Sequence, residues 1–138
     1  MPPLQLVLSR LRGIGQLVWS YSQACRASRR YSLANKLRRN GRLEEALAVA
    51  HEGLSLLRQP GVIRGNCCES TVLIFLTIMV EQLAHKLQQP GASEQDLRDS
   101  FSSLQALGSR GGRSGQELRT VWLPYLQARI GVEGDPTP

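Results

Sequence analysis

Apolar residues recur at steps of three and four along most of this chain, the spacing of helices with one buried face. Residues 4–22 show it first, in a stripe made of Leu4, Val7, Leu8, Leu11, Ile14 and Val18. Gly13 and Gly15 weaken this helix, because glycine loses more backbone freedom than other residues do. Residues 22–30 are polar and basic with small side chains. The pattern therefore predicts a first helix over residues 4–22.

A helical hairpin is predicted next, around the dipeptide Asn40-Gly41. Leu33 and Leu37 indicate a short helix before it, and the glycine can take the left-handed conformation that closes a helix. The helix after the turn spans about 42–58. Its apolar face has a nearly ideal helical period and consists of Leu43, Ala46, Leu47, Ala50, Leu54 and Leu57.

The most apolar segment is predicted to be a core helix over about residues 67–89, with Asn66 as a candidate cap. It contains the run TVLIFLTIMV, bounded by Glu69 and Glu81. That run alone is too short to span a membrane. Its β-branched residues would also suit a strand, but its flanks continue a helical pattern and no partner strand is visible.

Two more helices follow. Ser93 and Asp96 have the spacing of a capping box and open a helix that ends near Leu107. Residues 108–115 predict a flexible loop, after which Ser114 and Glu117 repeat the capping spacing at the start of a last helix. Pro124 should kink or divide that helix, because proline has no backbone N–H to donate.

These elements predict an all-α fold, a small antiparallel bundle of four to five helices, because short loops place successive helices in opposite directions. Aromatic residues make up only 5% of the chain, which also favours helices over a β-sandwich. We expect a basic amphipathic segment over residues 1–31, a helical domain over 32–130 and a disordered tail over 131–138.

The hairpin resembles a tetratricopeptide repeat over about residues 30–60. The match rests on the small and apolar positions of that family, here Leu33, Ala34, Leu37, Gly41, Leu43, Ala46 and Gly53. Arg30 and Arg58 depart from it, standing where the family has tryptophan and proline, and Ala50 is smaller than usual. No second copy of the pattern is visible. The resemblance implies binding of a peptide or helix in a concave groove.

Positive charge is concentrated at the start of the chain. Nine of the 17 Lys and Arg residues lie in residues 1–43, which contain no Asp or Glu. Residues 1–31 combine five arginines and four serines with an amphipathic helix, and they resemble a mitochondrial presequence. We therefore expect a mitochondrial protein, with the cytoplasm or nucleus as the alternative location.

Two short motifs overlap near residue 30. Arg29, Tyr31 and Ser32 resemble the matrix-peptidase pattern, and cleavage after Tyr31 would leave Ser32 as the new N-terminus. The same segment fits a basophilic kinase site at Ser32. Phosphate there would add about −1.5 to −2 charges among basic side chains.

A basic N-terminal arm that is not removed has other interpretations. It could lie on an anionic membrane or dock on a partner protein through its apolar stripe. It could also contact the phosphates of a nucleic acid, although no helix-turn-helix, RNA-recognition or zinc pattern accompanies it. The simplest alternative is a solvated basic helix that packs on its own domain.

Motifs for metal binding and catalysis are weak. Cys25, Cys67 and Cys68 form no disulfide framework, and the adjacent pair lacks the two-residue gap of a zinc knuckle. We expect Cys67 and Cys68 to pack inside the fold, His51 to be partly buried and His85 to face solvent. The loop GSRGGRSG lacks the lysine of a phosphate-binding loop. We predict no metal, no cofactor and no enzymatic activity, with an uncharacterised enzyme as an alternative.

The sequence thus predicts a non-catalytic adaptor or assembly factor that binds a peptide or helix of another protein. The candidate partner-binding residues lie near the hairpin and in one aromatic pair close to the C-terminus, and they are Asn35, Arg38, Arg39, His51, Trp122 and Tyr125. The competing hypothesis is a protein whose basic arm binds nucleic acid or an anionic membrane.

Overall fold

The computed structural model describes residues 3–107 and 112–131, and these residues contain five α-helices. In chain order they are α1 (Leu4–Arg39), α2 (Leu43–Leu57), α3 (Cys67–Leu87), α4 (Glu94–Leu107) and α5 (Gly112–Gly131). These residues contain no strand, so the all-α prediction is confirmed. The tail predicted to be disordered lies, from residue 132 onward, outside the described residues.

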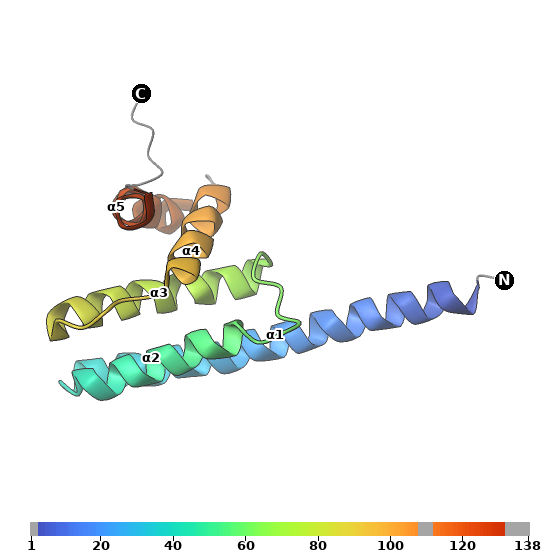
Figure 1. Ribbon diagram of the computed structural model, residues 1–138, viewed down its shortest axis with the longest axis horizontal. Helices are drawn as coiled ribbons and strands as arrows, with labels where there is room; N and C mark the ends of the chain where they lie inside the picture. Colours follow the sequence, from blue (N-terminus) through green and yellow to red (C-terminus); the bar gives the residue numbers. More distant parts are fainter. Residues whose placement is uncertain (1–2, 108–111, 132–138) are drawn as a thin grey trace, which may run out of the picture.

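The first three helices lie side by side and alternate in direction (Figure 1). Gly41, with φ +80°, closes α1 in the left-handed conformation and turns the chain into α2, as predicted. Helices α4 and α5 pack on each other, and α4 connects the pair to α3. Figure 1 shows this second pair on the far side of α3 from α2. The helices therefore form two groups that share α3.

Helix α1 is one unbroken helix of 36 residues, which corrects the prediction of two separate helices before Asn40. Residues 22–30, which carry no stripe of large apolar residues, are helical throughout. Ala24 and Ala27 are buried there, because small side chains let α1 lie close to its neighbours. Residues 16–40 also contain no glycine or proline to interrupt the helix. At 1.5 Å per residue, α1 is about 54 Å long.

Helix α3 is the core helix, as predicted. Leu73, Leu76, Val80 and Leu83 on it are completely buried. By length and composition the 21-residue helix α3 could cross a membrane, because an 18-residue apolar window within it has a mean hydropathy of 1.5, although the run TVLIFLTIMV alone is too short. In the fold, however, 61% of that apolar window is buried against the rest of the protein.

The helix starts agree only partly with the predicted caps. Ser93 caps α4, and its hydroxyl accepts the backbone N–H of Asp96 at 3.2 Å, as predicted. Asn66 occupies the position before α3 but does not cap it. Its side-chain amide donates instead to Glu69 at 3.3 Å.

Helix α5 begins at Gly112, so residues 112–115 are helical and not part of a loop as predicted. The ion pair between Arg113 and Glu117, one turn apart at 3.9 Å, supports this early start. The helix also continues through Pro124 and is not divided there. Residues 108–111 of the predicted loop lie outside the described residues.

A buried carboxylate fastens α4 to the segment between α2 and α3. Asp96 is fully buried and accepts hydrogen bonds from the guanidinium groups of Arg58 and, at 2.6 Å, Arg64. Arg64 also donates to Asp99 at 2.7 Å. Burial raises the pKa of Asp96, but the two arginines outweigh it and hold that pKa below its usual value. The ion cluster therefore fixes α4 without an unpaired buried charge.

Candidate interaction site

The predicted binding residues around the hairpin are only partly brought together. Arg38 donates to the side-chain oxygen of Asn35 at 2.7 Å, and both are half-buried, whereas Arg39 is exposed. His51 is half-buried near Arg58, and burial together with that positive charge lowers the pKa of its imidazole. No hydrogen bond or ion pair links His51 to Asn35 or Arg38 among the described residues.

The predicted aromatic pair is held by the fold. Trp122 and Tyr125 meet edge to face, with ring centroids 5.4 Å apart. The Tyr125 hydroxyl donates to Glu81 at 2.8 Å, and Arg129 donates to the same carboxylate at 2.6 Å. Because its hydroxyl is used inside the protein, Tyr125 offers mainly its ring to a partner.

The predicted processing segment lies inside α1. The ring centroid of Tyr31 is 5.7 Å from that of Phe75 on α3, and Arg30 pairs with Glu52 on α2 at 3.4 Å. Ser32 is exposed. Cleavage after Tyr31 stays a prediction. It would remove part of the core, namely the buried residues Ser20, Gln23, Ala24 and Ala27.

The cysteines and histidines are placed partly as predicted. Cys67 and Cys68 are exposed, so the prediction that they pack inside the fold was wrong. They form the first turn of α3, ahead of Glu69, the first buried residue of that helix. His51 is half-buried and His85 exposed, as predicted. In the described part of the chain, no three His, Cys, Asp or Glu residues are placed to hold a metal ion.

Helix α1 leaves the body of the protein at Trp19 and Ser20. The Trp19 indole N–H donates to the carbonyl of Pro60 at 3.1 Å. The Ser20 hydroxyl, which is completely buried, donates to Glu69 and accepts the backbone N–H of Ile63 at 2.8 Å. We call residues 4–19 of α1 the arm, and the remaining described residues from Ser20 onward the body. These polar contacts fix the direction in which the arm points.

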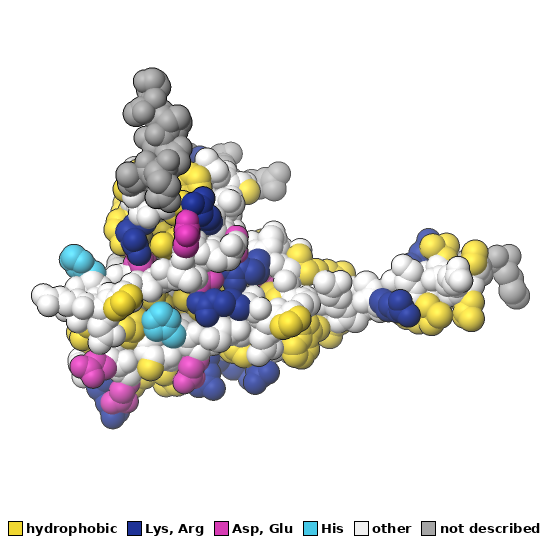
Figure 2. All heavy atoms as spheres, viewed as in Figure 1, with side chains coloured by type: hydrophobic (Ala, Val, Ile, Leu, Met, Phe, Trp, Pro, Cys, Tyr) yellow, Lys and Arg dark blue, Asp and Glu magenta, His cyan; other side chains and the backbone are white. Residues whose placement is uncertain are grey.

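The arm stands away from the body and carries a stripe of exposed apolar side chains (Figures 1 and 2). Exposure within this stripe ranges from 39% at Val7 to 73% at Leu4. We call it the arm stripe, and it consists of Leu4, Val7, Leu8, Leu11, Ile14 and Val18. Its only charged neighbours within the arm are Arg10 and Arg12.

The arm stripe faces away from the side of α1 that packs on the body. Val18 and Ser20 are two residues apart, which places them about 200° apart around the helix. One line of helical steps from Ser20 toward the N-terminus reaches Gln16, Gly13, Ser9 and Gln5, whereas steps of three from Ser20 and Ser9 reach the exposed Leu17 and Leu6. Where the body ends, the body-facing side of α1 thus becomes more polar than the opposite side, although it still carries Leu6 and Leu17. This pattern does not suit an arm that folds back on its own body.

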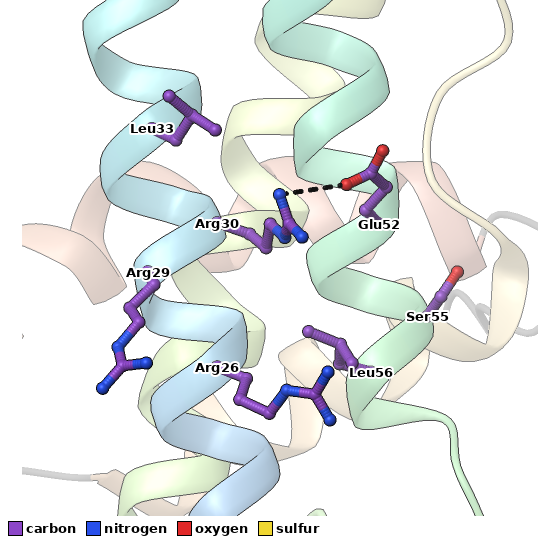
Figure 3. Close-up of a pocket in the computed structure, with 7 residues that line it drawn as sticks. All are labelled: Arg26, Arg29, Arg30, Leu33, Glu52, Ser55 and Leu56. Carbon is purple, nitrogen blue, oxygen red and sulfur yellow. Dashed lines mark ion pairs between the residues drawn. The ribbon is translucent and has the colours of Figure 1, made fainter.

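The outward side of α1 continues into a basic groove beside α2. Helical steps of three and four from Val18 toward the C-terminus reach Arg26, Arg29 and Leu33, which lie on the same side of α1 as Val18. These residues line a hollow of about 570 Å³ together with Arg30, Glu52, Ser55 and Leu56 (Figure 3). We call it the arginine groove. In Figure 3, Arg30 points to Glu52 across the groove, Arg26 extends toward Leu56, and Arg29 points away from α2.

A second hollow, of about 690 Å³, lies where α3 faces α4 and α5. Small and apolar residues line it, among them Ile74, Phe75, Leu107 and Leu118, and no charged side chain of the described residues contributes to it. It therefore offers a partner little charge specificity. The arm stripe and the arginine groove form the more distinctive surface.

No family model, no curated protein and no solved structure matches this chain. The resemblance of the hairpin to a tetratricopeptide repeat and that of residues 1–31 to a presequence stay predictions from the residues alone.

Proposed function

We propose that this protein is a non-catalytic adaptor that binds a helix of a partner protein along the arm stripe. The supporting observation is that six large apolar side chains are exposed on the side of α1 that faces away from its own body. Apolar area in contact with water costs about 25 cal/mol per Å², so monomeric proteins rarely expose such patches without a use. A second helix suits a straight stripe, because its side chains can fill the gaps between those of the first.

We also propose a mitochondrial location, with the arm acting as an address before the chain folds. Arg10 and Arg12 accompany the apolar stripe, and no acid is present in residues 1–43. The membrane potential favours entry of such a segment by about 2.3 kcal/mol per charge per 100 mV. A fluorescent reporter fused to residues 1–40 should collect in mitochondria, and a diffuse reporter would exclude this address.

Site-specific photocrosslinking tests the adaptor proposal. A photoreactive amino acid replaces Leu11 on the arm stripe, Gln16 on the opposite side of the arm, or Arg39 at the hairpin. We expect position 11 to give one protein adduct that mass spectrometry identifies, and position 16 to give none. An adduct from position 39 alone would place the binding site at the hairpin and contradict binding along the arm stripe.

The crosslinked partner is then purified and tested for direct binding. The double variant Leu11→Asp/Val18→Asp should lose at least tenfold in affinity, because it places charge on the contacting side. The matched control Gln5→Asp/Gln16→Asp adds the same charge to the opposite side and should bind like the parent protein. Equal loss in both variants, or adducts with lipid or nucleic acid only, would contradict a protein-binding stripe.

A further inference from the structure

We propose that the partner helix is acidic at one end and that its carboxylates enter the arginine groove. This inference rests on the proposed function and specifies the partner at the same surface. The partner would be an amphipathic helix that runs antiparallel to α1. Its first turn would carry Asp or Glu beside Arg26 and Arg29, and its apolar side would follow the arm stripe.

The spacing of the arm favours a paired helix. Apolar residues follow alternating steps of three and four over three heptads, at Leu4, Val7, Leu11, Ile14, Val18, Tyr21 and Cys25. This is the repeat by which two helices wind around each other, each side chain entering a gap in the facing helix. Tyr21 is 57% exposed, so the seam stays accessible for one step beyond the end of the arm.

The positive charge of the arginine groove favours an acidic partner helix. Arg26 donates a hydrogen bond to the side-chain oxygen of Gln23 at 3.2 Å, and the structure records no ion pair for Arg26 or Arg29 among the described residues. Glu52, the one carboxylate that lines the groove, already pairs with Arg30. The described part of the chain therefore supplies more basic than acidic groups there. Guanidinium groups bind carboxylates through two parallel hydrogen bonds, which suits Asp or Glu.

The dimensions set the length and direction of the partner. Leu4 and Arg29 are 25 residues apart on one helix, which corresponds to about 38 Å. A partner helix of about 25 residues spans that distance. Acidic residues stabilise the first turn of a helix, where the backbone dipole is positive. The acidic end at the groove is then the N-terminal end of the partner, which makes the two helices antiparallel.

A second copy of this chain fits the surface less well. The arm carries Arg10 and Arg12 and no acid, so a pair of arms would have no opposite charge along its seam. An anionic membrane would attract the same arginines, but the groove is concave and contains Glu52. We therefore expect the purified protein to sediment as a monomer.

A pair of synthetic peptides tests the inference. The first is a 25-residue helix with leucines at alternating steps of three and four and two glutamates in its first turn. The second replaces both glutamates with glutamine. Fluorescence anisotropy should show the acidic peptide binding about tenfold more tightly, as two partly exposed ion pairs would give. Arg26→Gln/Arg29→Gln should abolish that preference, while the control Arg39→Gln/Arg113→Gln, with the same loss of charge elsewhere, should keep it.

The outcomes separate this inference from the proposed function. If both peptides bind equally and Leu11→Asp/Val18→Asp prevents it, the adaptor proposal stands and the groove inference fails. If neither peptide binds, the adaptor proposal fails. A dimer that Leu11→Asp dissociates would assign the stripe to a second copy. Binding to phosphatidylserine vesicles without preference between the peptides would assign it to a membrane. Both of these results overturn the inference.

Discussion

Glu81 and Asp96 are almost completely enclosed by the protein, yet both carboxylates are paired with arginines. Glu81 accepts hydrogen bonds from Arg129, from the Tyr125 hydroxyl and, at 2.7 Å, from the backbone N–H of Ala92. A buried charge without partners would be strongly destabilising, so each set of contacts must form as a whole. Glu81 thus joins α3 to α5, and Asp96 joins α4 to the segment between α2 and α3.

Acid should weaken the protein through these two groups. Burial raises the pKa of Glu81, but Arg129, the Ala92 N–H and Tyr125 outweigh it and lower that pKa, as the arginines do for Asp96. A carboxylate with a lowered folded-state pKa stabilises the fold above its unfolded pKa of about 4. That contribution is lost as the pH falls through the folded-state pKa. Thermal unfolding followed by circular dichroism should therefore show a melting temperature that drops steeply below about pH 4.

The variant Glu81→Gln serves as the control for this pH dependence. It removes one of the two titrating groups, so its melting temperature should start lower at pH 7 and fall less between pH 5 and pH 3. An identical fall in the variant and the parent protein would show that Glu81 does not contribute.

Helices with a periodic face of large apolar residues could be predicted from the sequence. Helix α2 was expected over about 42–58 and is observed at Leu43–Leu57, because its stripe is regular and Gly41 marks its start. Helix α1 was predicted in two pieces, because its middle packs through serine and alanine. Small residues become a buried face only when a neighbouring helix comes close, and that closeness is a tertiary property.

The candidate site could also be predicted from the sequence only in part. The arm stripe follows from spacing alone. The exposure of these side chains does not, because it depends on where the body ends along α1. The sequence predicts Tyr125 as a partner-binding residue, but it does not reveal that the Tyr125 hydroxyl donates to Glu81, 44 residues earlier in the chain. The arginine groove needs α2 beside α1, so no local pattern in the sequence reveals it.

Two glycines in helices should respond to alanine in opposite ways. A Cβ atom at Gly53 would lie 2.9 Å from a methyl carbon of the buried Leu76 and 3.3 Å from the Cβ of Arg30, so Gly53→Ala forces α2 away from α1 and α3. We expect a loss of about 1–2 kcal/mol in the free energy of unfolding, measured with urea. A Cβ at Gly13 would meet nothing within 4 Å, so Gly13→Ala should increase the helical signal of the arm. Equal stability in the Gly53 variant would contradict this packing.

Removal of N-terminal residues should separate the arm from the body at the level of the whole molecule. Deletion of residues 2–17 removes only exposed side chains of the described chain, so the melting temperature should change by no more than a few degrees. Deletion of residues 2–31 also removes the buried Ser20, Gln23, Ala24 and Ala27, and with them the cooperative unfolding transition. Circular dichroism and size-exclusion chromatography measure both results.

This pair of deletions also bears on processing of the N-terminus. A cooperative melt for residues 32–138 would show that the fold does not need the first part of α1, and would favour cleavage after Tyr31. If the shorter chain fails to fold, a mature protein must keep residues upstream of Tyr31. Sequencing the N-terminus of the native protein would then find the chain beginning before Ser20.

Because α1 is continuous, the stage of folding at which the arm becomes helical depends on the body. Nucleating a helix is unfavourable, because the first turn fixes several residues for one hydrogen bond, whereas extending an existing helix costs little. A free peptide of residues 4–19, with two glycines, would be only marginally helical in water. In the folded protein, the half of α1 packed in the body supplies the nucleus, and the arm only has to grow from it. The arm stripe is therefore ordered only in molecules whose body has already folded. An ordered arm thus distinguishes folded from unfolded protein.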